Sequence, residues 1–421
     1  MTKVLSSILS CLTLISGSIT LFGQSSNIPL DKEYYHTIER LEILEGKNKL
    51  NSSVKPYSRK DIGKYTDGLT EKADYSASSL NWIRYENKDW SDTASTLDHQ
   101  PLFSKVYKQS SSLLSVYTDN LHLHVNPLVS GFLGKEKSNG TTLYRNARGI
   151  EVYGSIMKKV GFYTSVTENQ VIFPSYINNR IGLNAVIPGE AFWKRFNSNG
   201  VDYFNAAGYI SFQLLEPIQL QFGYDKQFIG NGYRSLILSD YSAPMAYLKL
   251  TTNLWKFSYT NLFTEMTADI TTSGGVPNGT ALFSKKYMAF HHLNLHIGKK
   301  LDVGVFESII FSREDSLGNG GFELGYLNPL IFYRSVEQNL GSEDNAILGL
   351  DFKWNFAKQF SLYGQLVLDE LVVKEVLAGN GWWGNKQSGQ IGMKYINSFG
   401  IDGLDLQGEV NIVRPYMYSH T

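Results

Sequence analysis

The feature that most constrains the fold of this chain is a hairpin unit repeated between Tyr203 and Arg414. In each unit an alternating apolar/polar strand of about ten residues meets a short turn, a matching strand follows, and a long polar loop comes next. In residues 404–412 one face carries Leu404, Leu406, Val410 and Ile412, and the other carries Asp405, Gln407, Glu409 and Asn411. A soluble sandwich can contain such strands, but alternately short and long connections over so many hairpins are typical of transmembrane barrels. We therefore predict an all-β fold, an antiparallel transmembrane β-barrel of the outer-membrane type.

The composition agrees with a barrel and excludes several other classes. Only 42% of the 421 residues are hydrophobic and the mean hydropathy is −0.21, which gives no support for a helical membrane protein. A barrel keeps such values because its lumen-facing residues are polar. Lys+Arg and Asp+Glu both total 39, so no charge excess favours nucleic acid as a partner. The 26 Tyr and 23 Phe suit aromatic girdles at two membrane interfaces.

Residues 1–24 have the pattern of a secretory signal peptide, with Lys3 before an apolar stretch and small Gly23 near the expected cleavage point. The only cysteine, Cys11, lies inside this leader, so we expect no disulfide or thiol chemistry in the exported chain. A lipoprotein modified at Cys11 is the alternative, although that residue sits early in the apolar stretch. We therefore expect the leader to direct the chain through the inner membrane, and we expect the barrel to lie in the outer membrane of a Gram-negative cell.

Residues 25–100 change from a period of two to the helical period and are expected to form a periplasmic helical segment and linker. One helix should carry Tyr34, Ile38 and Leu41 and end at Gly46. A second should begin at the capping-box sequence 58–61, and a third should lead towards Trp90. Such a bundle can cap the barrel floor. The alternative is a flexible leader with transient helices, because short isolated helices are marginally stable.

Residues 101–421 form the predicted barrel. We place about thirteen strands at 121–134, 141–156, 160–169, 204–215, 218–228, 244–253, 255–266, 286–297, 301–311, 345–356, 359–370, 386–397 and 404–414. Bacterial single-chain barrels have an even number of strands and both termini in the periplasm. Here the last strand runs outward and the sequence stops at Thr421, so we expect it to lack its final strands.

The alternation also predicts which way the side chains point. Within the strand at 345–356, the lipid-facing set should be Leu348, Leu350, Phe352, Trp354 and Phe356, and the inward set Asp351, Lys353 and Asn355. Short connections fall at 157–159, 216–217, 253–254, 298–300, 356–359 and 399–403, and long ones at 170–203, 229–243, 267–285, 312–344 and 371–385. Two long loops contain enough apolar residues to fold into the barrel: 170–203, with Phe192 and Trp193, and 312–344, with Tyr326–Tyr333.

No motif indicates catalysis or a cofactor. The sequence 379–384 matches GxGxxG, but it opens no βαβ unit and two indoles stand where a pyrophosphate would approach. His122 with His124 and His292 with His296 share strand faces, yet no cysteine or carboxylate cluster completes a metal site, which favours a polar lumen wall. Asp369 and Glu370 alternate on a strand and so cannot serve one acid/base site. We expect a non-enzymatic protein with no cofactor and no metal.

Two segments, 223–235 and 328–345, combine aromatic, charged and planar polar side chains. This mixture suits carbohydrate, whose CH faces stack on aromatic rings and whose hydroxyls bind planar polar groups. It suits equally well an inward-folded plug held by ion pairs. The candidate residues of this polysaccharide-binding or plug network are Tyr224, Asp225, Lys226, Asn231, Arg234, Tyr333, Arg334, Glu337 and Gln338 across the lumen, and the rim residues Trp382 and Trp383.

The stretches 223–240, 325–345 and 366–370 resemble the Wzi-type capsule-assembly outer-membrane proteins, in the divergent branch that includes gliding-motility-associated surface proteins. The resemblance implies a barrel of about eighteen strands with a periplasmic helical bundle, a plugged lumen and a role in holding surface polysaccharide without catalysis. The expected partners are surface polysaccharide, outer-membrane lipid and the barrel-insertion machinery, with no nucleic acid, and the expected state is a monomer. A diffusion porin and a surface adhesion or gliding scaffold remain the alternatives.

Overall fold

The computed structural model describes residues 25–30, 33–48, 50–69, 77–91, 112–157, 159–184, 186–190, 192–197, 199–271, 283–312, 321–329, 333, 344–370, 373–379, 382 and 384–418. The helices are α2 (Tyr34–Glu45), α3 (Arg59–Asp67), α4 (Ala77–Glu86), α5 (Ser175–Asn184) and α7 (Val373–Ala378), with 3₁₀ turns η1 (Lys88–Trp90), η2 (Leu324–Leu327) and η3 (Ser398–Gly400). The strands are β1 (Val54–Lys55), β2 (Leu114–Tyr117), β3 (Leu121–Lys135), β4 (Thr142–Ile156), β5 (Val160–Ile172), β6 (Lys194–Phe196), β7 (Gly200–Leu215), β8 (Ile218–Asp225), β9 (Phe228–Ile229), β10 (Met245–Leu254), β11 (Phe257–Thr271), β12 (Phe283–Ile297), β13 (Leu301–Phe311), β14 (Asn345–Ala357), β15 (Phe360–Glu370), β16 (Lys386–Tyr395) and β17 (Leu406–Val413).

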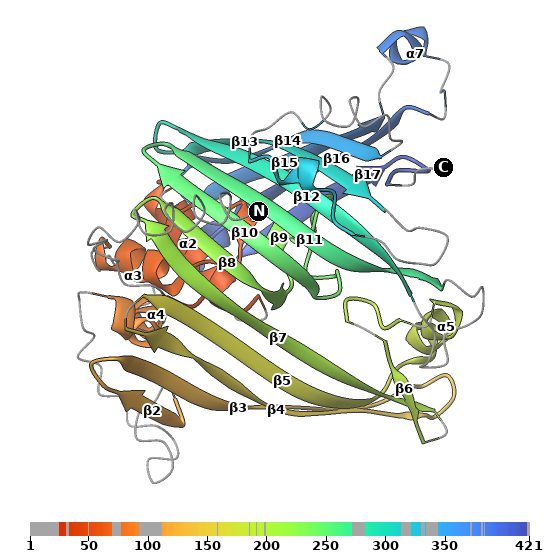
Figure 1. Ribbon diagram of the computed structural model, residues 1–421, viewed down its shortest axis with the longest axis horizontal. Coiled ribbons are helices and arrows are strands. Elements are labelled where there is room, and N and C mark those ends of the chain that lie inside the picture. Colours follow the sequence, from red (N-terminus) through yellow and green to blue (C-terminus); the bar gives the residue numbers. More distant parts are fainter. Residues whose placement is uncertain are drawn as a thin grey trace, which may run out of the picture.

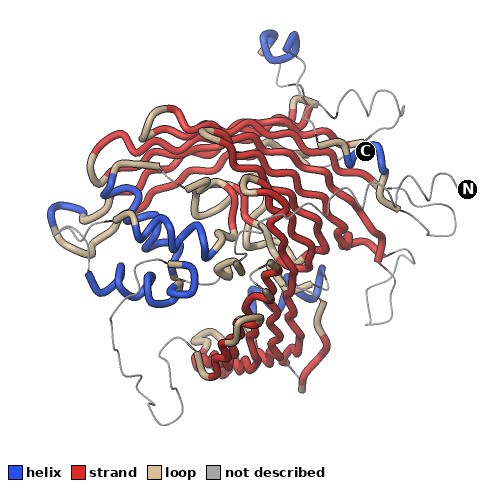
Figure 2. The backbone as a smooth tube through the Cα atoms, turned by 60° about the vertical axis from the view of Figure 1, so that its left-hand side comes forward, coloured by secondary structure: helices blue, strands red, loops and turns tan. Residues whose placement is uncertain are grey.

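The wall is one 15-stranded antiparallel sheet in which each long strand pairs with the next in the chain, from β2 to β17, and β6 adds to β7. The sheet curves into a barrel wall around helices and loops (Figures 1 and 2). The thirteen strands expected from the sequence are all present, and the predicted incomplete antiparallel barrel fold is confirmed, since the described end strands β2 and β17 do not pair with each other. The short strands β2 and β6 and the internal pair β1–β9 were not predicted, because a few residues carry no readable period.

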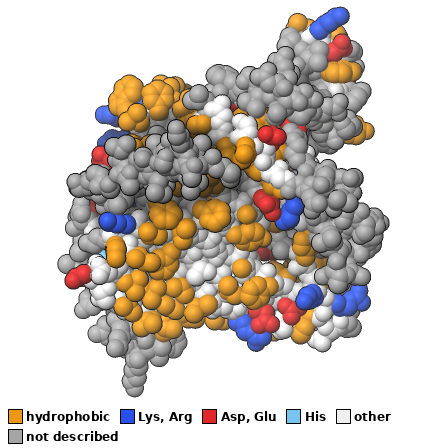
Figure 3. Space-filling model, viewed as in Figure 1, with side chains coloured by type: hydrophobic (Ala, Val, Ile, Leu, Met, Phe, Trp, Pro, Cys, Tyr) orange, Lys and Arg blue, Asp and Glu red, His pale blue; other side chains and the backbone are white. Residues whose placement is uncertain are grey.

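Strand β14 shows the two faces of the wall. Leu348, Leu350, Trp354 and Phe356 are exposed and Phe352 is half-buried, whereas Asp351, Lys353 and Asn355 are buried inside the curve. The predicted assignment of this strand is therefore confirmed. In the view of Figure 3, apolar side chains gather over the lower-left part of the strands. At the short connections the exposed aromatic residues Trp255 and Phe399 suit a membrane interface.

The N-terminal helices form the predicted bundle. Helix α2 ends at Gly46, whose φ of 60° places it in the left-handed region, and the side chain of Ser58 caps α3 by accepting from the Asp61 N–H at 3.4 Å. Apolar residues of the three helices share one core with Ile396, which lies beside the last short connection. None of the described helices is long and apolar enough to cross a membrane. The bundle is a folded unit and not a transient leader.

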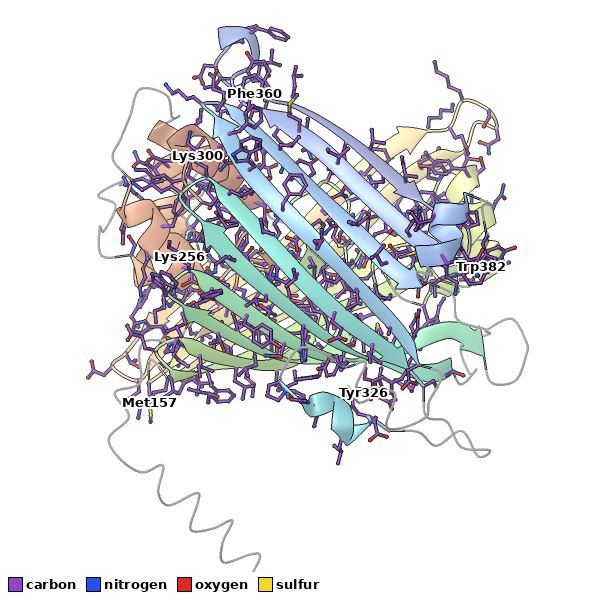
Figure 4. All side chains as sticks on the ribbon, turned by 90° about the horizontal axis from the view of Figure 1, so that it is seen from above. Met157, Lys256, Lys300, Tyr326, Phe360 and Trp382 are labelled. Atoms are coloured by element: carbon purple, nitrogen blue, oxygen red, sulfur yellow. The ribbon has the colours of Figure 1, made fainter. Side chains whose placement is uncertain are left out.

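The bundle lies at the end of the wall that carries the short connections. Asn48 donates its backbone N–H to the carbonyl of Lys299 at 2.7 Å, and Arg40 donates to Asp405 at 2.7 Å. In Figure 4 the labelled residues Met157, Lys256, Lys300 and Phe360 mark this end, and Tyr326 and Trp382 mark the other. The helices thus cover the barrel floor as predicted. The predicted leader, residues 1–24, and most of the linker 91–100 lie outside the described residues.

Candidate functional site

The interior of the barrel is occupied by two pieces of chain, which we call the plug: residues 50–57 with β1, and the β8–β10 connection, residues 226–244, with β9. The two strands pair antiparallel, with Val54 opposite Ile229 and Lys55 opposite Phe228. Val54 and Ile229 are buried in one apolar cluster with inward-facing wall residues such as Tyr153, Phe290 and Phe306. Side chains from distant wall strands therefore meet the plug in a shared core.

Helix α2 holds the plug to the wall through buried ion pairs. Glu39 accepts from Lys55 of β1 at 2.9 Å and from Lys394 of β16 at 2.6 Å. One turn further on, Glu42 accepts from Lys353 of β14 at 2.6 Å. All five side chains are almost completely buried. Because a buried charge is costly without a partner, these pairs fix where the helix can lie against the wall.

The electrostatics of Glu39 follow from this arrangement. Burial alone would raise the pKa of its carboxyl, because desolvation disfavours the charged form. The attraction of Lys394, then of Lys55 and Lys353, outweighs burial and holds the pKa of Glu39 well below its ordinary value. The carboxylate is therefore ionised at neutral pH and acts as a permanent anchor.

The 226–244 connection is fastened to the wall by a second set of contacts. Asn231 accepts from the Ser52 hydroxyl at 2.8 Å, and its carbonyl accepts from Lys394 at 3.0 Å. Gln365 of β15 donates to the carbonyl of Ile229 at 2.9 Å and accepts from the Leu236 N–H at 2.8 Å. Because one glutamine binds the connection at two points, Ile229 and Leu236, the connection is held inside the barrel.

Gly230 is required where the connection turns. Its φ is 140°, and a Cβ there would stand 2.5 Å from the Gln365 amide nitrogen. Its N–H donates to the carbonyl of Ser53 at 2.7 Å, which extends the β1–β9 pairing by one bond. A side chain at this position would break the contact between plug and wall.

The next part of the connection contacts the final strands. The backbone N–H groups of Tyr233 and Arg234 both donate to the Glu409 carboxylate, at 2.7 and 3.1 Å. The guanidinium of Arg234 lies over the rings of Tyr233, at 5.0 Å, and Tyr241, at 5.7 Å. The predicted candidates Asn231 and Arg234 thus belong to the plug, Asn231 buried within it and Arg234 towards the long-connection rim.

Lys226 and Asp225 lie at the same rim. The ammonium of Lys226 binds the carbonyl of Gly189 and that of Asp240, the latter at 3.2 Å, so it joins two long connections. Asp225 accepts from the Lys226 N–H at 2.7 Å. Tyr224 differs from these residues, because it is exposed and alternates with inward Gln221 and Gly223 to face outward.

The described part of the long connection 312–344 is placed differently from the prediction. Tyr333 is fully buried, with its ring 4.1 Å from that of His291 and its N–H donating to Glu307 at 2.7 Å. His291 and Glu307 pair across β12 and β13, and their neighbours His292 and Phe306 face inward. Because successive strand residues point to opposite faces, His291 and Glu307 face outward. Tyr333 therefore lies on the outer face, and the expectation that it lies across the lumen is wrong.

We call the described part of this connection, residues 321–329 and 333, the outer strap. Tyr326 packs against Phe311, and the Pro329 carbonyl accepts from Tyr259 at 2.8 Å (Figure 4). The physical reason for its position is polarity. Without the strap, Asn261, His291 and Glu307 would expose polar groups to lipid on the outer face. Each polar group left there without a hydrogen-bond partner costs on the order of several kcal/mol.

The other predicted features have mixed outcomes. The connection with Phe192 and Trp193 does fold inward, packing on the inner-face residues Val171 and Tyr203. The histidines line the lumen as predicted: His124 binds Asp89 and His292 binds Asp351, both at 2.6 Å. Trp382 is half-buried, and its carbonyl accepts from Arg414 at 3.4 Å. Arg334, Glu337, Gln338 and Trp383 lie outside the described residues, so their binding or plug role stays a prediction.

Sequence reasoning missed the residues that hold the plug: Glu39, Glu42, Lys55, Lys353, Lys394 and Gln365. Alternation does place Lys353 and Lys394 inside the barrel, which implies an inward carboxylate partner. It does not say that the partner comes from a helix about three hundred residues earlier. Among the described residues no group of three or more His, Cys, Asp or Glu side chains is placed to hold a metal ion.

A cleft of about 450 Å³ opens at the long-connection rim. Residues from 180–192, the rim end of 224–246 and the upper ends of β11 and β12 line it. Phe192, Tyr224 and Tyr241 supply aromatic surface. The charged side chains of the lining come from the 180–192 segment and from β11 and β12. This cleft has the mixture expected of a carbohydrate site, and of the predicted candidates Tyr224 lines it.

No family model matches this chain, and no curated protein matches it. Several solved structures are similar. Wzi of Escherichia coli, described as an outer membrane protein involved in group 1 capsule assembly and a carbohydrate-binding β-barrel, has 14% identity over 94% of this chain and 75% of its own, with a TM-score of 0.49. OccK9 (OpdG) of Pseudomonas aeruginosa has 11% identity over 69% of this chain and 81% of its own, with a TM-score of 0.32.

OmpF of Salmonella typhi has 8% identity over 72% of this chain and 99% of its own, with a TM-score of 0.28. Likeness at these values assigns neither family nor function to this chain. The resemblance of its motifs to the Wzi-type family therefore stays a prediction, and function has to be inferred from the residues of the chain itself.

Proposed function

We propose that this protein is a non-enzymatic outer-membrane barrel that attaches or organises surface polysaccharide. The observation that carries the proposal is the plug: β1, β9 and the ion pairs of Glu39 and Glu42 fill and brace the interior instead of leaving a wide aqueous lumen. A rigid plug beneath a rim with an aromatic, charged cleft provides a fixed outer surface. Such a surface suits binding of a polymer outside the cell better than diffusion of solutes through the wall.

Two experiments test the proposal. A chromosomal deletion strain should release its surface polysaccharide into the medium while total polymer stays constant, as measured by staining and by assay of the supernatant. Full retention of polymer by the deletion strain would exclude the attachment role, and a loss of gliding or adhesion alone would point to the scaffold alternative. In a planar bilayer the purified protein should conduct poorly.

The second candidate is a diffusion porin, and one observation favours it. A polar hollow of about 280 Å³ lies at the short-connection end, between the plug and the inner face of β8, β10 and β11. Its lining includes Asn27, Gln219, Lys249 and Thr260. A stable conductance of hundreds of picosiemens, typical of an aqueous barrel lumen, would favour the porin and exclude a permanently closed plug.

A further inference from the structure

The wall has a notch at the long-connection rim. Strand β7 spans Gly200–Leu215 but β8 spans only Ile218–Asp225, so the uppermost pair between them is Gly208 with Tyr224. Above it the free edge of β7 pairs with the short β6. Two adjacent wall strands therefore part before the rim, and Figure 1 shows β6 and α5 beside the parting.

The 450 Å³ cleft lies beside this notch, over the rim ends of β8, β10, β11 and β12 and against residues 180–192, and we call it the notch cleft. Its lining includes outward residues of the strands, such as Tyr224 and Glu265, and inward ones, such as Met245 and Met266. Side chains of both faces can line one cleft only at an edge of the wall, because they point apart elsewhere. The cleft thus lies across the edge of the wall.

Three aromatic side chains present surface to the cleft: Phe192, Tyr224 and Tyr241. They come from three different connections or strand ends, so their position is set by the fold and not by one loop. Tyr241 is also fixed by the Arg234 guanidinium, 5.7 Å from its ring centre. Fixed rings of this kind bind the CH faces of sugar rings at low cost in side-chain entropy.

The charges of the cleft are not balanced. Glu265 pairs with Lys285 at 2.9 Å, and Glu190 lies 3.9 Å from the ammonium of Lys226 and accepts from Asn205 at 2.7 Å. Arg180 of α5 and Lys286 of β12 line the cleft, are exposed, and have no carboxylate partner among the described residues. Two cations in an aromatic cleft of the size of a few sugar units favour an anionic ligand.

We propose that the notch cleft binds an acidic residue of a polysaccharide, a uronic acid, with its ring against Tyr241 and Phe192 and its carboxylate between Arg180 and Lys286. This assignment rests on the proposed polysaccharide function and adds a location and a charge class to it. The site gives a role to Arg180 and Lys286, which pair with no carboxylate of the described plug or wall.

The test uses the full chain in detergent with a short oligogalacturonate as the probe, and its methyl ester as the neutral matched probe. Calorimetry should show binding of the free acid, at least about tenfold weaker binding of the ester, and a loss of affinity with rising salt. Equal binding of the acid and the ester would overturn the charge class. Failure of the wild-type chain to bind either probe would overturn the site.

Arg180→Gln and Lys286→Gln should each weaken binding about tenfold, with Lys137→Gln, an exposed cation on the β3–β4 connection, as the control that leaves affinity unchanged. Tyr241→Leu should weaken binding of the acid and of the ester alike, because it removes the stacking surface and not the charge. Since the two cations are exposed and unpaired, both glutamine variants should unfold at the wild-type temperature.

The outcomes separate this inference from the proposed function. If the probe binds and neither glutamine variant weakens it, the polymer is bound elsewhere on the protein and the notch proposal is wrong. If the deletion strain retains its polymer, the proposed function fails whatever the probe does. If the glutamine variants lose the probe and also release polymer from cells, both stand.

Discussion

Lys394, near the end of β16, donates to Glu39 of α2 across 2.6 Å, although 355 residues separate them in the chain. The same carboxylate accepts from Lys55 at 2.9 Å, so one side chain joins the helical bundle, the plug and the barrel wall. Such a contact needs all three parts in place, and it makes the plug a part of the folded barrel and not a loop that rests inside it.

Glu39→Gln should destabilise the folded barrel by about 3 kcal/mol, because it leaves Lys55 and Lys394 buried with no countercharge. Heat-induced gel mobility shift and thermal unfolding in detergent measure the change. Glu168→Gln is the matched control, since its pair with Arg148 is largely exposed and should contribute at most about 1 kcal/mol. Equal effects of the two variants would contradict the role of Glu39.

Acid should loosen the same anchor. The folded protein holds the pKa of Glu39 below its ordinary value of 4.5, so the carboxylate adds stability that is complete above that value. This stability is lost as the pH falls from 4.5 towards the lowered pKa, because in that range the unfolded chain binds a proton at Glu39 that the folded protein does not. Unfolding temperatures measured between pH 7 and pH 3 should fall less steeply in Glu39→Gln than in wild type.

Gly230→Val should partly dislodge the plug. Valine tolerates a φ of 140° poorly, and its Cβ would press on Gln365, so we expect a cost of about 2 kcal/mol or more. Planar-bilayer recording should show larger and noisier conductance than wild type. Gly131→Val, at a strand position where an added Cβ meets nothing within 4 Å, should leave conductance unchanged. Unchanged conductance in both variants would mean that the plug does not limit flow.

Tyr333→Ala should weaken the outer strap. The substitution removes a fully buried ring from His291 and opens the polar outer-face residues to lipid or detergent, at a cost of about 3 kcal/mol. Thermal unfolding measures it, with Leu324→Ala as the control on the same strap because Leu324 is 74% exposed. If the two variants unfold at the same temperature, the strap does not shield the polar outer-face residues.

Leu350→Arg should impair insertion. Leu350 faces outward near the middle of β14, where a cation facing lipid costs about 2–4 kcal/mol. Refolding into lipid vesicles, followed by gel mobility, should give a smaller folded fraction than wild type. Gln219→Arg places the same side chain in the polar hollow inside the barrel and should fold normally. A smaller folded fraction for Gln219→Arg than for Leu350→Arg would mean that the lipid-facing and lumen-facing sides of the wall are assigned the wrong way round.

The wall and the helical bundle follow from local patterns in the sequence. The period of two assigns each side chain of a strand to one face, so the thirteen long strands and the sides of Leu350 and Asp351 could be predicted from local pattern. The end of α2 at Gly46 and the start of α3 after Ser58 follow from capping chemistry within a few residues. These features depend on neighbours in the chain.

The positions of the long connections depend instead on contacts between residues far apart in the chain. A long loop has no period, and its place depends on polar partners supplied by remote strands. The 312–344 connection contains as many aromatic residues as a plug, yet its described part packs outside because Asn261, His291 and Glu307 need cover there. The 226–244 connection lies inside the barrel because Gln365 and Lys394 donate hydrogen bonds to its backbone and β1 pairs with its strand β9. Loop composition is similar in the two cases, and the distant partner decides between them.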